Sequence, residues 1–496
     1  MLFNSFPFFF VFLPCTLAAY FLISYDKRSF AIPTLVAASL IFYSYWNWRF
    51  TPLLIASIIL NYSFGRALAF YNRSDRRRLV LSIGVTINIL LLFYFKYLDW
   101  FIDVFATLFG VDFGTFGYPL PLGISFFTFT QIAYLVDTYH KKVSERSFSH
   151  FLLFVTYFPH LIAGPILHHA EMMPQFSSVS NKRISWHNIS LGLFLFLIGA
   201  IKKVGFADTL APFADRVFDG THQLSAADAW AGALAYTGQI YYDFSGYTDM
   251  ALGLSRMFNI SLPLNFNSPY KAKSIIDFWR RWHMTLSRFL RDYLYISLGG
   301  NRRGSTRRYL NLFITMLLGG IWHGAGWTFL IWGALHGSYL IVNHAVRAIR
   351  RRFNWDRRCL ADHLAQPLTF LAVVVAWVFF RATDLESALR IVQAMIGLGT
   401  INAIQFIPEF PDGLIGWVGD AHWLWISTLL VLAFLCPNSQ QITDWIEAIV
   451  DRMDIPGIYK QRLQFLFLGF MVSTIAFVIS VSGMRNGASP FIYFNF

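Results

Sequence analysis

Residues 309–343 read YLNLFITMLLGGIWHGAGWTFLIWGALHGSYLIVN, an apolar stretch interrupted near its middle by glycines and a histidine. A helix needs about 20 apolar residues to cross the hydrocarbon core of a bilayer, which is about 30 Å thick. The stretch is too long for one such helix, and its glycine-rich centre is a suitable place for a break. We therefore interpret it as a broken pair of membrane segments.

Similar apolar stretches recur along the chain, which is 56% hydrophobic and only 14% charged. An average soluble domain is about 25% charged, so a soluble protein of 496 residues would not hide this much apolar surface. We predict an all-α polytopic membrane protein of about ten to thirteen membrane segments, some of them re-entrant or broken. Besides 309–343, the segments are expected near residues 5–25, 30–48, 51–70, 79–98, 119–138, 149–166, 187–205, 226–255, 365–380, 423–436 and 462–482.

Positive charge in the short loops orients these segments, because Lys and Arg favour the cytosolic side. Two predicted segments separate the basic loops at 26–28 and 73–78, and the loop at 99–118 has no Lys or Arg. The next loop carries Lys141 and Lys142. This alternation puts the amino terminus outside, with the first apolar stretch as a retained span and not a cleaved signal.

The alternation then fails, because Lys182-Arg183 and Lys202-Lys203 flank one apolar stretch on both sides. We expect a re-entrant or interfacial segment within residues 149–205, where protein or water would satisfy the backbone. Suitable places for the break are Pro159, Gly164 and Pro165. With no repeat or appended soluble region, residues 1–496 are treated as a single membrane domain.

The longest weakly apolar stretch, 259–308, is rich in arginine and is expected to be an amphipathic segment that faces the cytosol. The net charge of +13 lies in short runs between apolar segments. We therefore expect lipid head groups and anionic cytosolic ligands as partners, and no nucleic acid. The three cysteines are widely spaced and predict neither a disulfide framework nor a metal site.

A first polar cluster, WRRWHMTLS at residues 279–287, lies in this basic stretch. These residues are predicted to form an amphipathic helix at the cytosolic interface, in which Trp279, Trp282 and Leu286 share one face, with the arginines opposite. The aromatic and basic residues fit an interfacial anchor helix as well as a functional site. His283 is the better functional candidate, because anchoring does not require an imidazole.

A second cluster places His323 and His336 inside the apolar stretch at 309–343, among glycines. An unbroken helix would separate the two imidazoles by about 20 Å and put them on different faces. They are therefore not expected to act as a direct pair. Each is either a functional histidine or a hydrogen-bonded packing residue, and packing is favoured for His336 more than for His323.

A third cluster, QIYYDFSGYTDM at residues 239–250, contains Asp243 and Asp249. Ionisable groups at membrane depth are costly and usually functional, so these carboxylates suit a proton or cation site. They suit equally well a structural role in bonding neighbouring helices.

The chemistry that these residues can support is narrow. The sequence has no Walker loop, Rossmann glycine pattern or Gly-x-Ser-x-Gly elbow. A neutral imidazole can nevertheless take the proton from a hydroxyl as that oxygen attacks a thioester carbonyl. Backbone N–H groups in the glycine-rich breaks can stabilise the oxyanion. Acyl transfer to a hydroxyl is therefore a reaction that these residues can support.

Six motifs of this sequence resemble the membrane-bound O-acyltransferase family, in the bacterial branch that serves alginate acetylation. The resemblance covers nearly the whole chain, and the last two motifs together are highly specific. The motifs are PLGISFFTF (121–129), IAYLVD (132–137), FPHLIAGP (158–165), DFSGYTDM (243–250), WRRWH (279–283) and WHGA (322–325).

The resemblance implies that His323 is the catalytic histidine and that His283 faces it across a central tunnel. It implies a cytosolic donor, acetyl-CoA or an acyl carrier, with no permanently bound cofactor and no metal. Acetyl would pass to a periplasmic SGNH-type transferase that modifies a polysaccharide, most simply alginate, in the bacterial inner membrane. Cellulose and peptidoglycan remain alternative acceptors. The residues expected to bind substrate or donor are Trp279, Arg280, Trp282, Trp322, Asp243 and Ser245.

A proton-coupled transporter is the alternative from another class. It would use Asp243 and Asp249 as a proton relay, but it gives no reason for the tryptophan-flanked basic stretch. Turnover of labelled acetyl-CoA by the purified protein separates the two readings.

Overall fold

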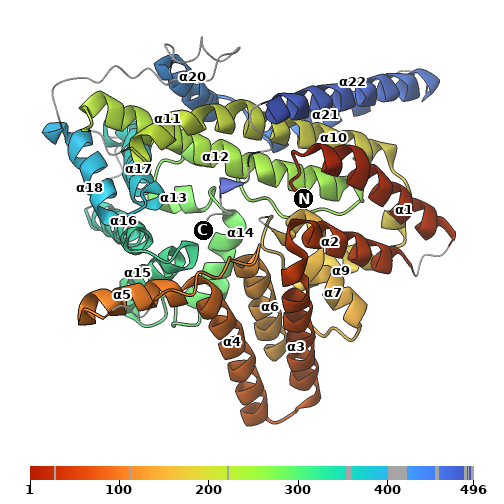
Figure 1. Ribbon diagram of the computed structural model, residues 1–496, viewed down its shortest axis with the longest axis horizontal. Coiled ribbons are helices and arrows are strands. Elements are labelled where there is room, and N and C mark those ends of the chain that lie inside the picture. Colours follow the sequence, from red (N-terminus) through yellow and green to blue (C-terminus); the bar gives the residue numbers. More distant parts are fainter. Residues whose placement is uncertain are drawn as a thin grey trace. The chain divides into compact units, whose positions relative to one another are not determined.

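A computed structural model describes residues 1–26, 30–111, 114–162, 164–220, 223–353, 360–399, 422–452, 457–484, 489 and 491–492. All regular elements of these residues are helices (Figure 1). The predicted all-α class is therefore confirmed. The chain divides into two compact units, and the long helix α12 (Ala226–Met257) contributes its first part to one and its last part to the other.

Unit 1 comprises residues 1–200, 247–264 and 439–495. Buried amides join its helices: Asn61 and Asn88 exchange hydrogen bonds of 3.1 and 2.7 Å, which fix α3 against α4. Such bonds hold helices together where lipid offers no polar partner. The helices of unit 1 are η1 (Pro7–Phe12), α1 (Leu13–Asp26), α2 (Ala31–Asn47), η3 (Trp48–Phe50), α3 (Thr51–Phe70), α4 (Ser74–Lys96), α5 (Leu98–Phe109), α6 (Ile124–Tyr139), α7 (Phe148–Thr156), α8 (Phe158–Leu161), α9 (His169–Ser177), η4 (Ser180–Lys182), α10 (Trp186–Ala200), α21 (Ser439–Arg452) and α22 (Gly457–Met484).

Unit 2 comprises residues 201–246 and 265–438. Its centre is an antiparallel pair of helices, α15 and α16, against which α13 and α17 also pack. The helices of unit 2 are η5 (Ile201–Ala207), α11 (Asp208–Phe218), η6 (Pro269–Lys271), α13 (Ile275–Trp279), α14 (Met284–Phe289), η7 (Leu290–Tyr295), α15 (Gly304–His323), α16 (Trp327–Arg352), α17 (Leu360–Arg381), α18 (Leu385–Gln393), η8 (Ala394–Leu398) and α20 (His422–Leu435).

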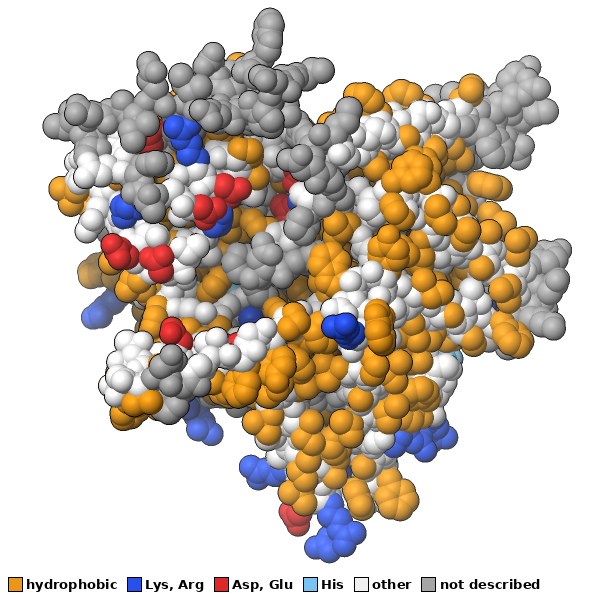
Figure 2. All heavy atoms as spheres, in the orientation of Figure 1, with side chains coloured by type: hydrophobic (Ala, Val, Ile, Leu, Met, Phe, Trp, Pro, Cys, Tyr) orange, Lys and Arg blue, Asp and Glu red, His pale blue; other side chains and the backbone are white. Residues whose placement is uncertain are grey.

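The surface of α3 and α4 has the distribution that a membrane requires. Hydrophobic side chains cover these two helices, and Lys and Arg side chains gather at the end where the helices connect (Figure 2). Ile59, Leu60, Ile87 and Leu90 are exposed along the helices, whereas the basic residues lie at 73–78. This distribution fits helices whose apolar sides contact lipid and whose arginine-rich end lies at the cytosolic surface.

Four helical segments of the described residues are long and apolar enough to cross a membrane: Ala31–Phe70, Ser74–Lys96, Trp186–Phe218 and His363–Arg381. The pair α20 and α21, taken as one broken span, would be a fifth, and Pro7–Ile23 and Leu466–Val481 are shorter apolar helices. The first segment has 40 residues and includes the short turn of η3. The total of ten to thirteen segments stays a prediction, as does the single domain.

Two predicted breaks are present, and one predicted helix is wrong. The stretch at 309–343 is a broken pair, because α15 ends at His323 and α16 begins at Trp327. Of the described residues within 157–168, only the four-residue helix α8 is regular, close to the expected prolines. By contrast, residues 279–287 do not form one helix: α13 ends at Trp279, α14 begins at Met284, and His283 between them has a φ of 41°.

Candidate active site

His323 is the last residue of α15, and its position depends on how closely α15 and α16 approach each other. A side chain at Gly320 would overlap the carbonyl oxygen of Phe329, and a Cβ at Gly333 would lie 2.6 Å from that of Met316. Small residues at such positions let two backbones pack tightly. The turn between the helices brings the imidazole of His323, 4% exposed, back against the first turns of α16.

Trp332 of α16 connects the two histidines of the broken pair. Its ring lies 4.9 Å from the ring of His323 and 4.8 Å from that of His336, edge to face in both cases. Phe380 of α17 contacts His323 from another side, with ring centroids 5.1 Å apart. The sequence-based separation of about 20 Å assumed an unbroken helix, and the reversal at residues 324–326 removes that assumption.

His336 is completely buried and is held by Trp279. The indole Nε1 of Trp279 donates a hydrogen bond of 3.2 Å to Nδ1 of His336. The rings of Trp279 and Trp332 also lie 5.8 Å apart. Trp279 was expected to bind donor or substrate, and the structure gives it a clear packing role beside Trp332. His336 has the hydrogen-bonded environment of the packing alternative.

His283 is also completely buried, in the turn between α13 and α14. The side-chain oxygen of Asn265 lies 3.0 Å from Nδ1 of His283 and also accepts hydrogen bonds from the backbone and hydroxyl of Thr285. An amide oxygen can only accept, so Nδ1 carries the proton and Nε2 carries a lone pair. Among the described residues, Nε2 has no hydrogen-bond partner.

The charge state of His283 follows from its burial. This residue lies outside the predicted membrane segments, and desolvation lowers its pKa to about 3. The imidazole is therefore neutral at physiological pH, with an unprotonated Nε2. A neutral imidazole with a lone pair and a fixed tautomer is the form that accepts a proton or a hydrogen bond from a hydroxyl.

Trp322 connects His283 with His323. Its ring lies 6.5 Å from that of His283 and 4.7 Å from that of His323. Phe244 of α12 closes the other side of His283 at 4.8 Å, edge to face. The two histidines that the sequence singled out thus belong to one aromatic cluster of unit 2, defined by Trp279, His283, Trp322, His323, Trp332, His336, Trp377 and Phe380.

Asp243 has a partner that the sequence interpretation missed. Nζ of Lys203 lies 2.5 Å from Asp243 and 2.8 Å from Asp208, and Lys203 and Asp243 are both buried. The signal was a lysine near the end of the predicted segment 187–205, where the alternation of charge fails. Asp249, six residues after Asp243, belongs to unit 1, where it accepts a 2.5 Å hydrogen bond from Ser439.

The remaining expected binding residues differ in exposure. Trp282 is 1% exposed and packs on Trp377 with ring centroids 4.9 Å apart. Ser245 is buried, and its hydroxyl has no hydrogen-bond partner among the described residues. Arg280 is exposed, as are Arg302 and Arg303. Ser245 and Arg280 therefore keep free polar groups for a ligand, whereas Trp282 contributes mainly to packing.

The fold and these motifs define a class. Residues 9–383 match the membrane-bound O-acyltransferase family, and the chain belongs to that family. It is therefore a multi-pass membrane O-acyltransferase.

The chain is similar to three proteins that are named for different polymers. The chain is 41% identical to the peptidoglycan O-acetyltransferase of Helicobacter pylori, across 100% of this chain and 98% of that protein. It is 43% identical to the probable alginate O-acetylase AlgI of Azotobacter vinelandii, across 80% of this chain and 79% of that protein. A teichoic acid D-alanyltransferase of Streptococcus thermophilus is 26% identical across 48% of this chain.

Proposed function

We propose that this enzyme takes acetyl from acetyl-CoA in the cytosol and passes it across the bacterial inner membrane for O-acetylation of an exported polysaccharide. The observation that carries the proposal is the aromatic cluster, which holds His283 neutral with a fixed tautomer and connects it through Trp322 to His323. Two buried imidazoles in a dry aromatic environment suit proton transfer more than ion binding.

The reaction needs one proton to move twice. His323 takes the proton from the acceptor hydroxyl as the oxygen attacks the thioester carbonyl. When the carbon–sulfur bond breaks, the same proton passes from His323 to the departing thiolate, so that ester and free thiol are the products. His283 accepts a hydrogen bond at Nε2 and thereby orients the hydroxyl or the pantetheine amide beside His323.

Exposed arginines of unit 2 support the proposal that acetyl-CoA is the acyl donor. Arg280, Arg302 and Arg303 are exposed in the stretch expected to face the cytosol. Guanidinium groups bind phosphates strongly, so they suit the phosphates of acetyl-CoA. A periplasmic SGNH-type transferase would receive the acetyl group and complete the modification.

Two acceptors are supported by different observations. Alginate follows from the resemblance of the motifs and from the identity to an alginate O-acetylase. Peptidoglycan is favoured by the match to a peptidoglycan O-acetyltransferase, which extends across the whole of this chain. The test expresses the enzyme in an alginate-producing host and in a peptidoglycan-acetylating host, each lacking its own membrane subunit. The acceptor is the polymer in which ester-linked acetate is restored.

The catalytic assignment is tested with His323→Ala and His283→Ala. Both variants are expected to reach the membrane at normal abundance and to lose at least about 100-fold of acetyl-CoA turnover, as for removal of a general base. The matched control is His344→Ala, because His344 lies on α16 beside Tyr309 and outside the aromatic cluster. Normal turnover in His323→Ala would remove His323 from the mechanism.

A further inference from the structure

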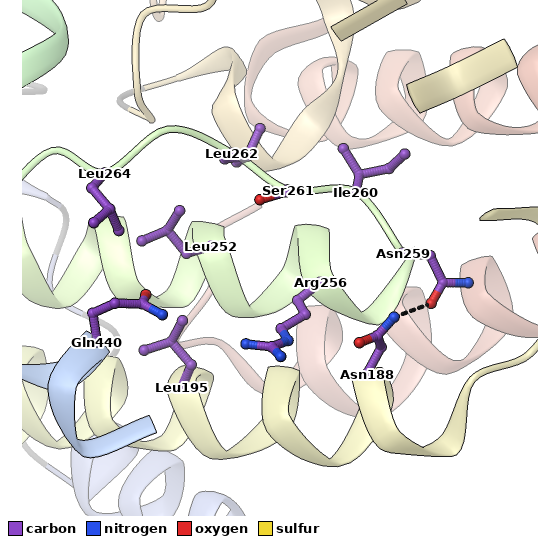
Figure 3. Close-up of a pocket in the computed structure, with 10 residues that line it drawn as sticks. All are labelled: Asn188, Leu195, Leu252, Arg256, Asn259, Ile260, Ser261, Leu262, Leu264 and Gln440. Atoms are coloured by element: carbon purple, nitrogen blue, oxygen red, sulfur yellow. Dashed lines mark hydrogen bonds between the residues drawn. The ribbon is translucent and has the colours of Figure 1, made fainter. Parts of the chain in front are cut away.

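Unit 1 contains a cavity of about 440 Å³ that belongs to no part of the proposed reaction. It lies between α10, the end of α12 and the start of α21, and the loop after α12 covers one side (Figure 3). One part of its wall is apolar and the other polar. The apolar residues are Leu195, Leu252, Ile260, Leu262 and Leu264, and the polar ones are Asn188, Arg256, Asn259, Ser261 and Gln440.

Hydrogen bonds hold the cavity open. The side chain of Asn259, a left-handed residue after α12, donates to the carbonyl oxygens of Asn181 and Arg183 and accepts from Asn188. The side-chain NH₂ of Gln175 donates a hydrogen bond to the carbonyl oxygen of Ser261. The backbone N–H of Ser261 donates a second one to the side-chain oxygen of Gln175. The covering loop is therefore fixed at two points, and the cavity is a built feature of unit 1.

Arg256 provides the polar centre of the cavity. Its side chain extends between α10 and α12 toward the end where Gln440 lies (Figure 3). Toward the part of the chain that the structure describes, Arg256 uses only Nη2, in bonds of 3.0 Å to both carboxylate oxygens of Glu447. The structure gives Nε and Nη1 no partner among the described residues. Nε carries one N–H group and Nη1 carries two, and these donors suit a phosphate bound in the cavity.

Negative charge lies close to this arginine. Glu447 binds Arg256 and also lies 2.9 Å from the ring nitrogen Nε2 of His187. The exposed carboxylate of Asp444 accepts a hydrogen bond from Gln440. These two carboxylates do not line the cavity, but they bind Arg256 and Gln440, which do. A ligand with a phosphate and an ammonium group complements both signs of charge at this end of the cavity.

The elements around the cavity also have the side chains of a membrane interface. Trp186 at the start of α10 and Trp445 on α21 are 50% and 60% exposed, and Ile449 follows on the same helix. Lys182 and Arg183 precede α10. Exposed tryptophans beside basic residues are typical of the level of lipid head groups. An amphipathic cavity at this level has lipid as its immediate neighbour.

We propose that this cavity binds a zwitterionic glycerophospholipid with a primary ammonium, that is, phosphatidylethanolamine. Arg256 binds the phosphate, Asp444 and Glu447 attract the ammonium, and the leucines contact the first acyl carbons. The site lies wholly within unit 1, and the aromatic cluster lies in unit 2. The proposal therefore stands or falls separately from the proposed reaction.

The test measures lipid retention by the purified full-length protein in detergent. Native mass spectrometry is performed after addition of phosphatidylethanolamine, phosphatidylglycerol or phosphatidylcholine at equal concentration. Wild type is expected to retain phosphatidylethanolamine about tenfold better than phosphatidylglycerol. The double variant Arg256→Gln/Glu447→Gln removes both charges together and is expected to lose this preference. Arg183→Gln, an exposed arginine outside the cavity, is the control and should behave as wild type.

A second variant distinguishes a blocked binding site from a misfolded protein. Ser261 is exposed at the mouth, so Ser261→Trp blocks entry without removing a charge or a buried group. It is expected to reduce retention of phosphatidylethanolamine about tenfold at an unchanged melting temperature. Equal retention of phosphatidylethanolamine and phosphatidylglycerol by wild type would overturn the proposal. Undiminished retention by the double variant or by Ser261→Trp would overturn it as well.

Discussion

Asn265 determines what His283 can do. Its side-chain oxygen accepts hydrogen bonds from His283 and twice from Thr285, so the imidazole has one tautomer and one orientation. The left-handed backbone at His283 is strained for a residue with a side chain, and the bond from Met284 N to Asn265 O helps to hold it. Orientation of a histidine by a neighbouring acceptor is a common way to prepare it for proton chemistry.

Asn265→Asp is therefore expected to change the pH dependence of the enzyme. In wild type, the low pKa of about 3 keeps His283 neutral, so its titration causes no loss of turnover from about pH 8 to about pH 5. A carboxylate at position 265 favours the imidazolium and raises that pKa. Turnover of the variant should then fall as the pH decreases through this range. Parallel pH profiles for wild type and variant would exclude His283 as an unprotonated group in the reaction.

Lys203 and its two carboxylates allow a second residue-level prediction. Removal of one partner from a buried ion pair leaves an uncompensated charge and costs about 3–5 kcal/mol. Lys203→Met leaves two carboxylates, Asp243 and Asp208, whereas Asp243→Asn leaves Lys203 paired with Asp208. Lys203→Met should therefore lower the melting temperature in detergent more than Asp243→Asn does. The opposite order would mean that Asp243 has a role beyond this ion pair.

At the level of elements, the contact between α15 and α16 sets the active-site geometry. Gly320 and Gly333 face each other across the pair, and Gly337 adjoins Phe313. The contact holds the end of α15, which carries His323, against Trp332 of α16. A change in helix separation would therefore move His323 relative to Trp332.

Gly333→Ala tests this dependence. The added methyl group would lie 2.6 Å from the carbonyl oxygen of Met316, and backbone has to shift to accept it. We expect a loss of about 1–3 kcal/mol of stability and a fall in turnover, measured by thermal denaturation and acetyl-CoA hydrolysis. Gly326→Ala is the matched control, because its nearest neighbour would lie 3.6 Å away and its extended backbone suits any residue. Equal effects of the two substitutions would contradict the packing argument.

At the scale of the whole molecule, Lys203 explains why the charge pattern failed after residue 182. Lys202-Lys203 is one of the two basic pairs that flank an apolar stretch, but Lys203 is 4% exposed and paired with Asp243 and Asp208. Lys202 lies over the ring of Tyr241 at 6.0 Å. The positive-inside rule applies to lysines in loops, so this pair does not mark a side of the membrane.

The orientation of the first helices is directly testable. In a variant without Cys15, Cys359 and Cys436, single cysteines are placed at Ser74 and at Gly114. A thiol reagent that does not cross membranes should label Gly114→Cys in intact spheroplasts and Ser74→Cys only after permeabilisation. Labelling of Ser74→Cys from outside would reverse the predicted topology of the chain.

The sequence by itself determined the helical membrane class and the break within residues 309–343, because both depend on local composition. Long apolar runs need lipid whatever their neighbours are, and glycine weakens a helix wherever it stands. It predicted wrongly that residues 279–287 form one helix, because hydrogen bonds from His283 and Met284 to Asn265, 18 residues before His283, stabilise the turn there.

Only the tertiary structure decided which polar groups pair. Lys203 meets Asp243, Trp279 meets His336, and Arg256 meets Glu447, at separations of 40, 57 and 191 residues. No periodicity in the sequence carries such information, because a buried charge or imidazole selects its partner by position in the folded chain. The tautomer of His283 follows from its pairing with Asn265. The guanidinium nitrogens of Arg256 that stay free follow from its pairing with Glu447.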